Sequence, residues 1–354
     1  MTVSLSDDAM STFPVMESPG LDIGNPIRYI NFAMLAALTY RRTSAVVPAL
    51  LLALATPHAA TAQETTAFAF LRNDVGARAA ALAGSVTAVT GDPTIMFYNP
   101  ASIGTLTTPS GSAGFFKHLL DINAGYVVYG QEIAGFGNVG AGVVYTNYGS
   151  FDGADEFDNP TGTFTASDLA LSAGYSNTLE ENVFYGGAVK FIFSSIAGYR
   201  ATALAADAGI LYRIPASRLT LGASLRNIGS ETATYDGVHE LLPLDFAVGA
   251  SVVPRGLPLL LNVDFHRLNE NPGGFIDRFR AFTVGGEFTL SSVFRARFGY
   301  NNQSRKDLQT GTASGLAGFS AGIGITVSGT VVDYALSSLG VIGNLHRISV
   351  STTF

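Results

Sequence analysis

The sequence predicts an all-β fold: a transmembrane antiparallel β-barrel of about 14 strands, with an N-terminal, partly helical hatch in its lumen. Charged residues make up only 13% of the chain, against about a quarter in soluble proteins. Beyond Gln63 the apolar residues never form the run of about 20 that a membrane helix needs. They recur in short segments with period-2 alternation, which is how a barrel distributes its hydrophobicity.

The chain divides into three predicted parts. Residues 1–62 are an N-terminal extension and signal peptide, residues 63–109 are the hatch, and residues 110–354 are the barrel. The net charge of −7 gives no support to nucleic-acid binding, which needs a basic face.

An export signal is expected before the hatch. An arginine pair precedes the apolar run 45–55, and small residues follow it, so we place the cleavage site between Ala62 and Gln63. A membrane anchor is the alternative, which Pro48 and the shortness of the run disfavour. Met34 is an alternative translation start.

Segments that alternate between apolar and polar residues fill the chain from residue 110 onward, and each ends at turn residues. Each has about the length that a tilted transmembrane strand needs. The predicted strands are 110–118, 120–132, 135–148, 165–178, 182–195, 200–213, 217–228, 243–254, 257–268, 278–289, 292–303, 317–328, 330–338 and 343–354.

The connections between these strands alternate in length. Every long connection follows an odd-numbered strand, and the even-numbered strands end in tight turns. Barrels with both termini in the periplasm show this parity, because their periplasmic turns are short and their external loops are long. A soluble sandwich has no reason to alternate in this way. The predicted external loops are 149–164, 229–242, 269–277 and 304–316.

Ionised side chains within the strands are predicted to face the lumen. A Lys or Arg that faces lipid at mid-depth costs about 2–4 kcal/mol, and none of these charges falls on the apolar face. The inward charge network consists of Lys190, Asp207, Arg226 and Asp245, then Glu287 beside Arg295, and Asp333 beside Arg347. A conducting channel usually concentrates one sign of charge, so these balanced charges predict a filled, rigid lumen.

Two further segments have predicted roles. The terminal strand ends on Phe354, and it resembles the signal by which the barrel-insertion machinery recognises its clients. In the hatch, the Ala-rich stretch 74–89 carries Val75, Ala79 and Leu82 at helical spacing. The hydrophobic pattern of the hatch is too weak for a domain of its own, and we expect the hatch to lie inside the barrel as a plug.

Two motifs associated with enzymes lack the context that their chemistry needs. Residues 135–140 match the dinucleotide pattern Gly-x-Gly-x-x-Gly, but they open a strand and no helix follows. Residues 318–322 match Gly-x-Ser-x-Gly, but Ser320 lies within a strand. His266 also faces the lumen, so a hydrolase inside the barrel is a third alternative. We expect no catalytic residues.

No metal site or cofactor is expected. The chain has no cysteine, and its five histidines lack the spacing of zinc ligands. The acidic stretch 152–158 leaves Ca²⁺ binding as an alternative to a solvated loop.

Several motifs together resemble the PorV/PorQ family of outer-membrane proteins, over roughly residues 66–290. They are Phe70-Leu-Arg72, Gly76-Ala-Arg78, Asp92-Pro93, Tyr98-Asn-Pro-Ala101, Tyr148-Gly-Ser-Phe151, Lys190-Phe-Ile-Phe193, Leu225-Arg-Asn-Ile-Gly229 and Leu242-Pro-Leu-Asp245. The Tyr-Gly-Ser-Phe motif favours the PorQ branch. The resemblance implies a FadL-like barrel of fourteen strands with an N-terminal hatch.

The resemblance also implies a role, that of a non-enzymatic component of the type IX secretion system. Besides outer-membrane lipid, its partners would be a PorZ-like surface protein, a PorU-like sortase and a PorV-like barrel. The external loops would be the docking surface, with candidate residues Tyr148, Phe151, Asp155, Phe157, Tyr235 and His239. The alternative is a FadL-like transporter of hydrophobic small molecules, with Gly186-Gly187 and Gly285-Gly286 as candidate sites for a gap in the wall.

Overall fold

The computed structural model describes residues 68–117, 122–235, 237, 239–270, 273–308 and 315–354. All of them belong to one compact unit, His58–Phe354. The predicted signal peptide and its cleavage site at Ala62 and Gln63 lie outside the described residues.

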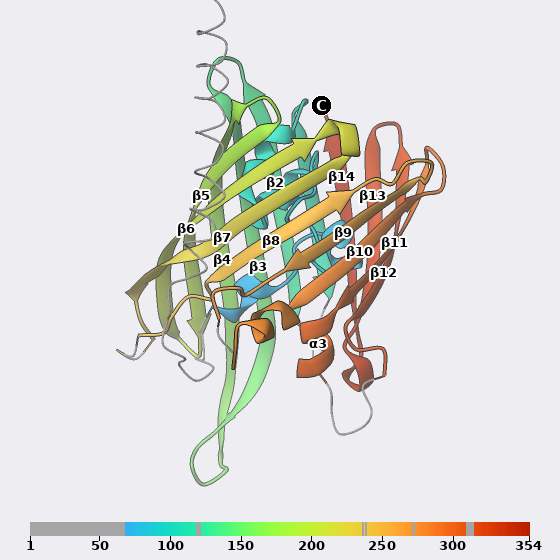
Figure 1. Cartoon of the computed structure of the whole chain (residues 1–354). Coiled ribbons are helices and arrows are strands. Elements are labelled where there is room, and N and C mark those ends of the chain that lie inside the picture. The colour runs from blue at the N-terminus through green and yellow to red at the C-terminus, as the bar shows by residue number, and fades with distance from the viewer. Residues whose placement is uncertain (1–67, 118–121, 236, 238, 271–272, 309–314) are drawn as a thin grey trace, which may run out of the picture. The chain divides into compact units, whose positions relative to one another are not determined.

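The described residues form a closed barrel of fourteen antiparallel strands, in which β1 pairs with β14 and every other strand pairs with its sequence neighbours (Figure 1). The predicted barrel is confirmed, and every predicted strand is present. Most ends differ by a few residues, but the third and seventh strands end five or six residues later than predicted, the fourth begins five residues earlier, and the tenth begins at Phe282 instead of residue 278. The strands are β1 (Ser110–Lys117), β2 (Asn123–Ile133), β3 (Gly137–Ala154), β4 (Pro160–Glu180), β5 (Val183–Ile196), β6 (Tyr199–Ile214), β7 (Leu219–Ala233), β8 (Asp245–Val252), β9 (Leu259–Phe265), β10 (Phe282–Thr289), β11 (Phe294–Asn301), β12 (Phe319–Val327), β13 (Thr330–Ser338) and β14 (Asn344–Thr353).

The alternation of side chains along each strand separates the lumen from the surroundings of the barrel. In β5, Lys190 and Ile192 are buried in the lumen, whereas Val189 and Phe191 are exposed on the outer face. Large apolar side chains such as Phe298 are likewise exposed on other strands. This apolar outer face matches the hydrocarbon core of a bilayer. None of the helices formed by the described residues is long and apolar enough to cross a membrane.

Residues 68–109, here called the internal segment, lie inside the barrel (Figure 1, blue to teal). The short helix α2 contacts β11–β14, whereas the 3₁₀ helix η3 contacts β3–β6, on the opposite side of the lumen. Because it touches both sides, the segment fills the lumen. Its helices are η1 (Ala69–Arg72), α2 (Ala77–Ala81), η2 (Pro93–Phe97) and η3 (Pro100–Thr105).

The helical spacing over 74–89 predicts a longer helix than the five residues of α2. Ala83 and Gly84 adopt φ values of 54° and 78°, and the Gly84 N–H donates to the Ala79 carbonyl at 2.9 Å. This arrangement ends the helix as a glycine cap does. The spaced residues still share one buried cluster, which explains why the sequence shows the period.

Glycines on the inner face of the wall allow the internal segment to approach it. A Cβ at Gly186 would lie 2.6 Å from backbone atoms of Pro100 and Ala101, and one at Gly285 would lie 3.0 Å from Leu82. Both strands keep their pairing with both neighbours. The wall therefore has no gap at either glycine pair in this structure. Gly186 and Gly285 make room for the internal segment, whereas a Cβ at Gly187 or Gly286 would meet only wall atoms, so a gap that opens at these pairs stays a prediction.

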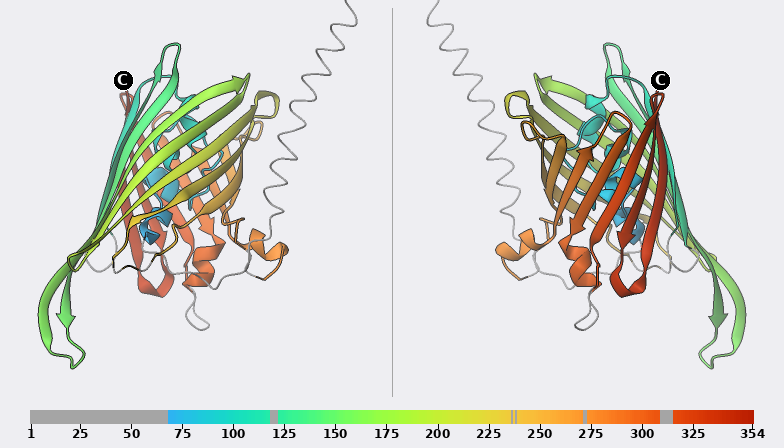
Figure 2. Two further views of the ribbon diagram at one scale, coloured as in Figure 1. Left: turned by 90° about the vertical axis from the view of Figure 1, so that its left-hand side faces the viewer. Right: turned by 90° about the vertical axis from the view of Figure 1, so that its right-hand side faces the viewer.

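The long connections lie at one end of the barrel, and part of them is regular structure. β3 and β4 continue past the rim as a hairpin, paired from Ser150 with Thr165 to Ala154 with Pro160 (Figure 2). The prediction of a loop over 149–164 is therefore wrong for most of its length. Two other long connections contain the turn η5 (Ile276–Arg280) and the helix α3 (Asn302–Asp307). The remaining 3₁₀ turns are η4 (Pro215–Ser217) and η6 (Gly340–Ile342).

Candidate functional site

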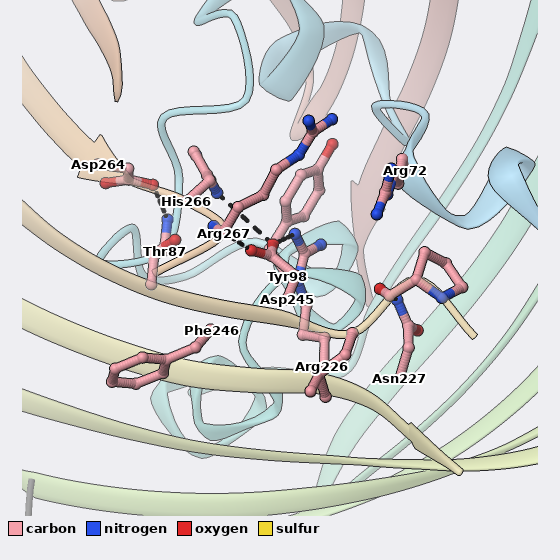
Figure 3. Close-up of polar contacts among 12 residues, drawn as sticks. Arg72, Thr87, Tyr98, Arg226, Asn227, Asp245, Phe246, Asp264, His266 and Arg267 are labelled. Carbon is pink, nitrogen blue, oxygen red and sulfur yellow. Dashed lines mark hydrogen bonds and ion pairs between the residues drawn. The ribbon is translucent and has the colours of Figure 1, made fainter. Parts of the chain in front are cut away.

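A cavity of about 140 Å³ lies in the lumen at the end of the barrel that carries the long connections. The internal segment supplies Arg72, Asp74 and Tyr98 to its lining, and α3 supplies Gln303 and Asp307. The wall supplies Arg226, Asn227, Asp245, His266 and Arg267 (Figure 3). The cavity is therefore enclosed largely by charged and polar side chains.

Asp245, at the start of β8, accepts three contacts that close the wall of the cavity (Figure 3). Its Oδ1 accepts the Arg267 backbone N–H at 2.7 Å. Its Oδ2 accepts a hydrogen bond from the Arg226 guanidinium and lies 3.7 Å from His266 Nδ1. Arg226 also lies over the Tyr98 ring, 5.5 Å from its centroid, so the same ion pair joins the wall to the internal segment.

Two residues of this wall adopt left-handed backbone conformations that glycine usually occupies. Asn227 has φ 60° and Arg267 has φ 53°. An aspartate carboxylate stabilises each of them by accepting a hydrogen bond from its backbone N–H. The Asn227 N–H donates to Asp207 at 2.8 Å, and the Arg267 N–H donates to Asp245. Backbone strain of this kind persists only where the surroundings fix it, and it is concentrated at functional sites.

Lys190 completes the first part of the predicted charge network. Its ammonium lies 2.7 Å from Asp207 Oδ2 and donates to Asn227 Oδ1 at 2.9 Å. Lys190, Asp207, Arg226 and Asp245 thus all serve the two strained wall residues beside the cavity. Sequence alternation predicts that these charges lie in the lumen, but strand periodicity does not show that they stabilise two left-handed backbone conformations.

Asp74 faces the cavity from the internal segment. The Tyr98 hydroxyl lies 3.4 Å from its Oδ1, and no ion pair involves Asp74 among the described residues. Burial raises the pKa of Asp74 above its ordinary value, and more distant cations, Arg347 first, oppose that shift. Sequence reasoning missed this residue because it stands in the hatch, outside the strand pattern.

The second part of the charge network is arranged differently from the prediction. Glu287 and Asp333 both pair with Arg297, at 2.6 and 2.5 Å, and Glu287 also pairs with Arg78 of the internal segment at 2.9 Å. The predicted neighbours have other partners. Arg295 donates to the Thr326 hydroxyl; Arg347 donates to Ser337 and lies over Phe116.

The register explains this difference. Glu287 is directly opposite Arg297 in the β10–β11 pair, and Arg295 is opposite Thr289 at the end of the ladder. A register shift of two residues, which leaves both arginines facing the lumen, decides which of them lies opposite Glu287, and sequence alone does not fix that register.

Beside the polar cavity, the lumen carries an apolar cluster at the same end. Phe68 and Phe70 of the internal segment pack against inward-facing Ile192 of β5 and Ala201 of β6. Leu71 packs against this cluster and also lines the cavity. The interior of a barrel of this type is usually polar, so an apolar lining needs a specific reason.

The candidate docking residues divide into bonded and exposed ones. The Tyr148 hydroxyl donates to Asp168 at 2.6 Å, and the Tyr235 hydroxyl contacts Ser194, so both phenols are fixed to the wall. Phe151 stacks on Phe164 across the hairpin, with ring centroids 5.4 Å apart. Phe157 at the hairpin tip and His239 are largely exposed, and His239 lies 3.5 Å from Glu231.

The acidic hairpin tip has an internal explanation. Asp155 accepts backbone N–H bonds from Phe157 and Asn159, and the Asn159 side-chain amide donates to it at 3.0 Å. These bonds lower the pKa of Asp155. Within the part of the chain that the structure describes, no group of three His, Cys, Asp or Glu residues is arranged to hold a metal ion.

The residues of the hydrolase alternative point to different partners. The Ser320 hydroxyl donates to Ser337 at 3.1 Å, and His266 Nε2 lies 3.2 Å from the Thr283 hydroxyl. Ser320 and His266, the two residues of that alternative, are thus bonded to different side chains. Phe354 lies at the opposite rim, where its N–H donates to the Pro109 carbonyl.

The comparisons with known proteins rest on structure. No family model matches the chain, and no curated protein matches it. The toluene transporter TbuX of Ralstonia pickettii aligns with 79% of this chain and 98% of its own, at 13% identity and a TM-score of 0.55. The toluene transporter TodX of P. putida shows the same coverage and identity at a TM-score of 0.52. A FadL homologue of Pseudomonas aeruginosa shows 11% identity over the same shares, with a TM-score of 0.50.

At this level of identity the likeness concerns the fold, which is that of the FadL-type outer-membrane barrels. With the apolar outer face, the fold places the protein in the outer membrane of a Gram-negative bacterium. TbuX and TodX are named as toluene transporters, and a TodX mutant is named as a monoaromatic hydrocarbon channel. None of the comparisons points specifically to the PorV/PorQ family.

Proposed function

We propose that this protein carries small hydrophobic molecules across the outer membrane. The observation that supports this most directly is the apolar cluster in the lumen at the external end, where Phe68 and Phe70 cover Ile192 and Ala201. A hydrophobic molecule that displaced these phenyl rings would find an apolar surface in an otherwise polar lumen. The TbuX and TodX structures, both named as toluene transporters, have the same fold.

The internal segment determines what kind of transport this can be. Residues 68–109 fill the lumen and are bonded to the wall by Arg78 with Glu287 and by Arg226 with the Phe97 carbonyl. A water-filled pore through the barrel axis is incompatible with this packing. Movement of a substrate therefore requires a local rearrangement, and the first residues of the segment, beside the cavity, are the part closest to the external loops.

Uptake by whole cells tests the proposal. The protein is expressed in a Gram-negative host that lacks its own hydrocarbon channels, and the initial uptake of labelled toluene and of a labelled sugar is measured. We expect faster toluene uptake than in cells with the empty vector, and unchanged sugar uptake. Ile192→Gln should reduce the toluene rate, and Ile192→Leu should retain it. A toluene rate equal to the vector control, with the barrel present in the membrane, would refute the proposal.

A second candidate function is the secretion role that the sequence resemblance implies. It is favoured by one feature, the β3–β4 hairpin, which extends past the rim and exposes Phe157 at its tip (Figure 2). In this role the hairpin would hold a PorZ-like surface protein next to a PorU-like sortase and a PorV-like barrel.

Shortening the hairpin separates the two candidates. Replacing residues 153–160 by a tight turn removes the tip and leaves the cavity and the apolar cluster in place. If the protein is a scaffold, co-purification of the partners is lost and toluene uptake is unaffected. If it is a transporter, uptake continues and secretion of proteins with a C-terminal secretion domain does not change.

A further inference from the structure

The turn η5 lies on the external rim beside the barrel wall (Figure 2, orange). Phe275 and Ile276 are 66% and 80% exposed. They stand next to Phe279 on the connection between β9 and β10. Exposed apolar residues of this size are costly in water, so their surroundings need an explanation.

A row of aromatic rings joins this turn to the lipid-facing wall. The Phe275 and Phe279 ring centroids are 5.6 Å apart, and those of Phe279 and Phe265 are 5.5 Å apart, both edge to face. Phe265 has the same strand parity as Leu261 and Val263, which are exposed on the outer face of β9. The row therefore begins on the surface that touches hydrocarbon and continues to the rim.

The rim near η5 also differs in charge from the rim at the hairpin. Residues 267–280 contain three arginines and two acids, and α3 contains Arg305 and Lys306 with one acid. The hairpin stretch 150–165 contains four acids and no base. The side chain of Arg280 is 65% exposed, while it pairs with Asp277 at 2.8 Å. A partner of η5 is therefore expected to combine an apolar part with negative charge.

We propose that η5 is an interfacial anchor that binds the anionic outer leaflet of the membrane. Phe275 and Ile276 lie in the boundary between headgroups and acyl chains, and Arg280 meets the phosphate groups. Amphipathic elements that lie in the membrane plane combine apolar, aromatic and basic side chains in this way. The occupant is lipid because the aromatic row is continuous with the lipid-facing wall. The inference does not depend on the transport proposal.

Tryptophan fluorescence tests the anchor, since the chain contains no tryptophan. The full protein with Phe275→Trp is placed in vesicles of phosphatidylcholine and phosphatidylglycerol, with or without bromine on the acyl chains. Phe298→Trp on the outer face serves as the lipid control, and Phe157→Trp at the hairpin tip serves as the water control. Circular dichroism verifies that each variant keeps its β structure.

We expect Phe275→Trp to emit at short wavelength, to lose fluorescence with brominated lipid, and to resist quenching by acrylamide. It should thus behave like Phe298→Trp. If it instead matches Phe157→Trp, with acrylamide quenching and no effect of bromine, η5 stands in water and the inference is wrong.

The role of charge has its own measurement. In the Phe275→Trp background, omission of phosphatidylglycerol should weaken quenching by brominated lipid. Adding Arg280→Gln should abolish that dependence on phosphatidylglycerol, while Arg280→Lys should preserve it. Quenching that is identical in all these vesicles and variants would show that no anionic headgroup is bound and would overturn this part of the inference.

Discussion

At the scale of single residues, the lumen is organised by a few ionised side chains with defined partners. Arg297 is 1% exposed and forms ion pairs with both Glu287 and Asp333. Removing one partner of a buried ion pair is more costly than losing a surface pair, because the remaining charges stay in a medium of low polarity. The arginine at position 295, two residues earlier on the same strand, bonds a neutral hydroxyl and makes a matched comparison.

Arg297→Gln should therefore lower the free energy of unfolding by about 3–5 kcal/mol. Arg295→Gln should lower it by about 0.5–1.5 kcal/mol, the usual value for one hydrogen bond. Urea titration followed by circular dichroism in the same detergent measures both variants. Equal losses would mean that the Arg297 cluster does not carry the stability assigned to it.

Asp74 gives a prediction about pH. Its ordinary pKa is 3.8 and burial raises its pKa in the folded protein. Below pH 3.8 the carboxyl is protonated in both the folded and the unfolded protein. Above pH 3.8 the unfolded protein releases this proton first. The free energy of unfolding therefore falls as the pH rises through the folded pKa. Asp74→Asn removes this loss and keeps the shape of the side chain.

The unfolding midpoints of the parent and of Asp74→Asn should thus coincide at about pH 3 and separate at about pH 7, with the variant the more stable protein. Titration at several pH values measures the difference. A variant that is less stable than the parent at neutral pH would show that the ionised carboxylate is favourably paired and that the assigned pKa direction is wrong.

At the scale of elements, the wall and the internal segment fit together through inward-facing glycines. Gly186 and Gly187 are adjacent, but only Gly186 faces the internal segment: a Cβ there would lie 2.6 Å from backbone of Pro100 and Ala101, whereas at Gly187 the nearest atom is 3.6 Å away. Because backbone atoms cannot move aside as a flexible side chain can, the two positions should respond differently to one added methyl group.

Gly186→Ala should destabilise the protein by about 1–3 kcal/mol, the usual cost of overpacking. Gly187→Ala should change stability by about 0.5 kcal/mol or less. Urea unfolding of the two variants under the same conditions makes the comparison. If both variants were as stable as the parent, the close packing of the internal segment against β5 would be refuted.

The strands were predictable because lipid imposes a strict alternation on them, whereas the internal segment faces no such constraint. Lys190 and Asp245 could be placed in the lumen from parity alone. The left-handed conformations of Asn227 and Arg267 could not, since neither is a glycine and nothing in the strand pattern marks a bulge. The partner of Glu287 was missed because Arg295 and Arg297 have the same parity and only the register distinguishes them.

At the scale of the whole molecule, the barrel is a closed wall around a bonded internal segment, with an apolar cluster and a polar cavity at the external end. The sequence resemblance emphasised the external loops and a secretion role, while the fold and the lumen support transport of hydrophobic molecules better. Both proposals concern a barrel whose lumen is filled by residues 68–109, and a filled lumen does not conduct ions.

Electrical recording across a planar lipid bilayer tests that requirement most directly. After insertion of the unmodified protein, we predict no steady conductance in molar salt, and brief openings at most when the first residues of the internal segment rearrange. A stable, large conductance in every inserted molecule would contradict the account, because it would mean that residues 68–109 do not fill the barrel in the membrane.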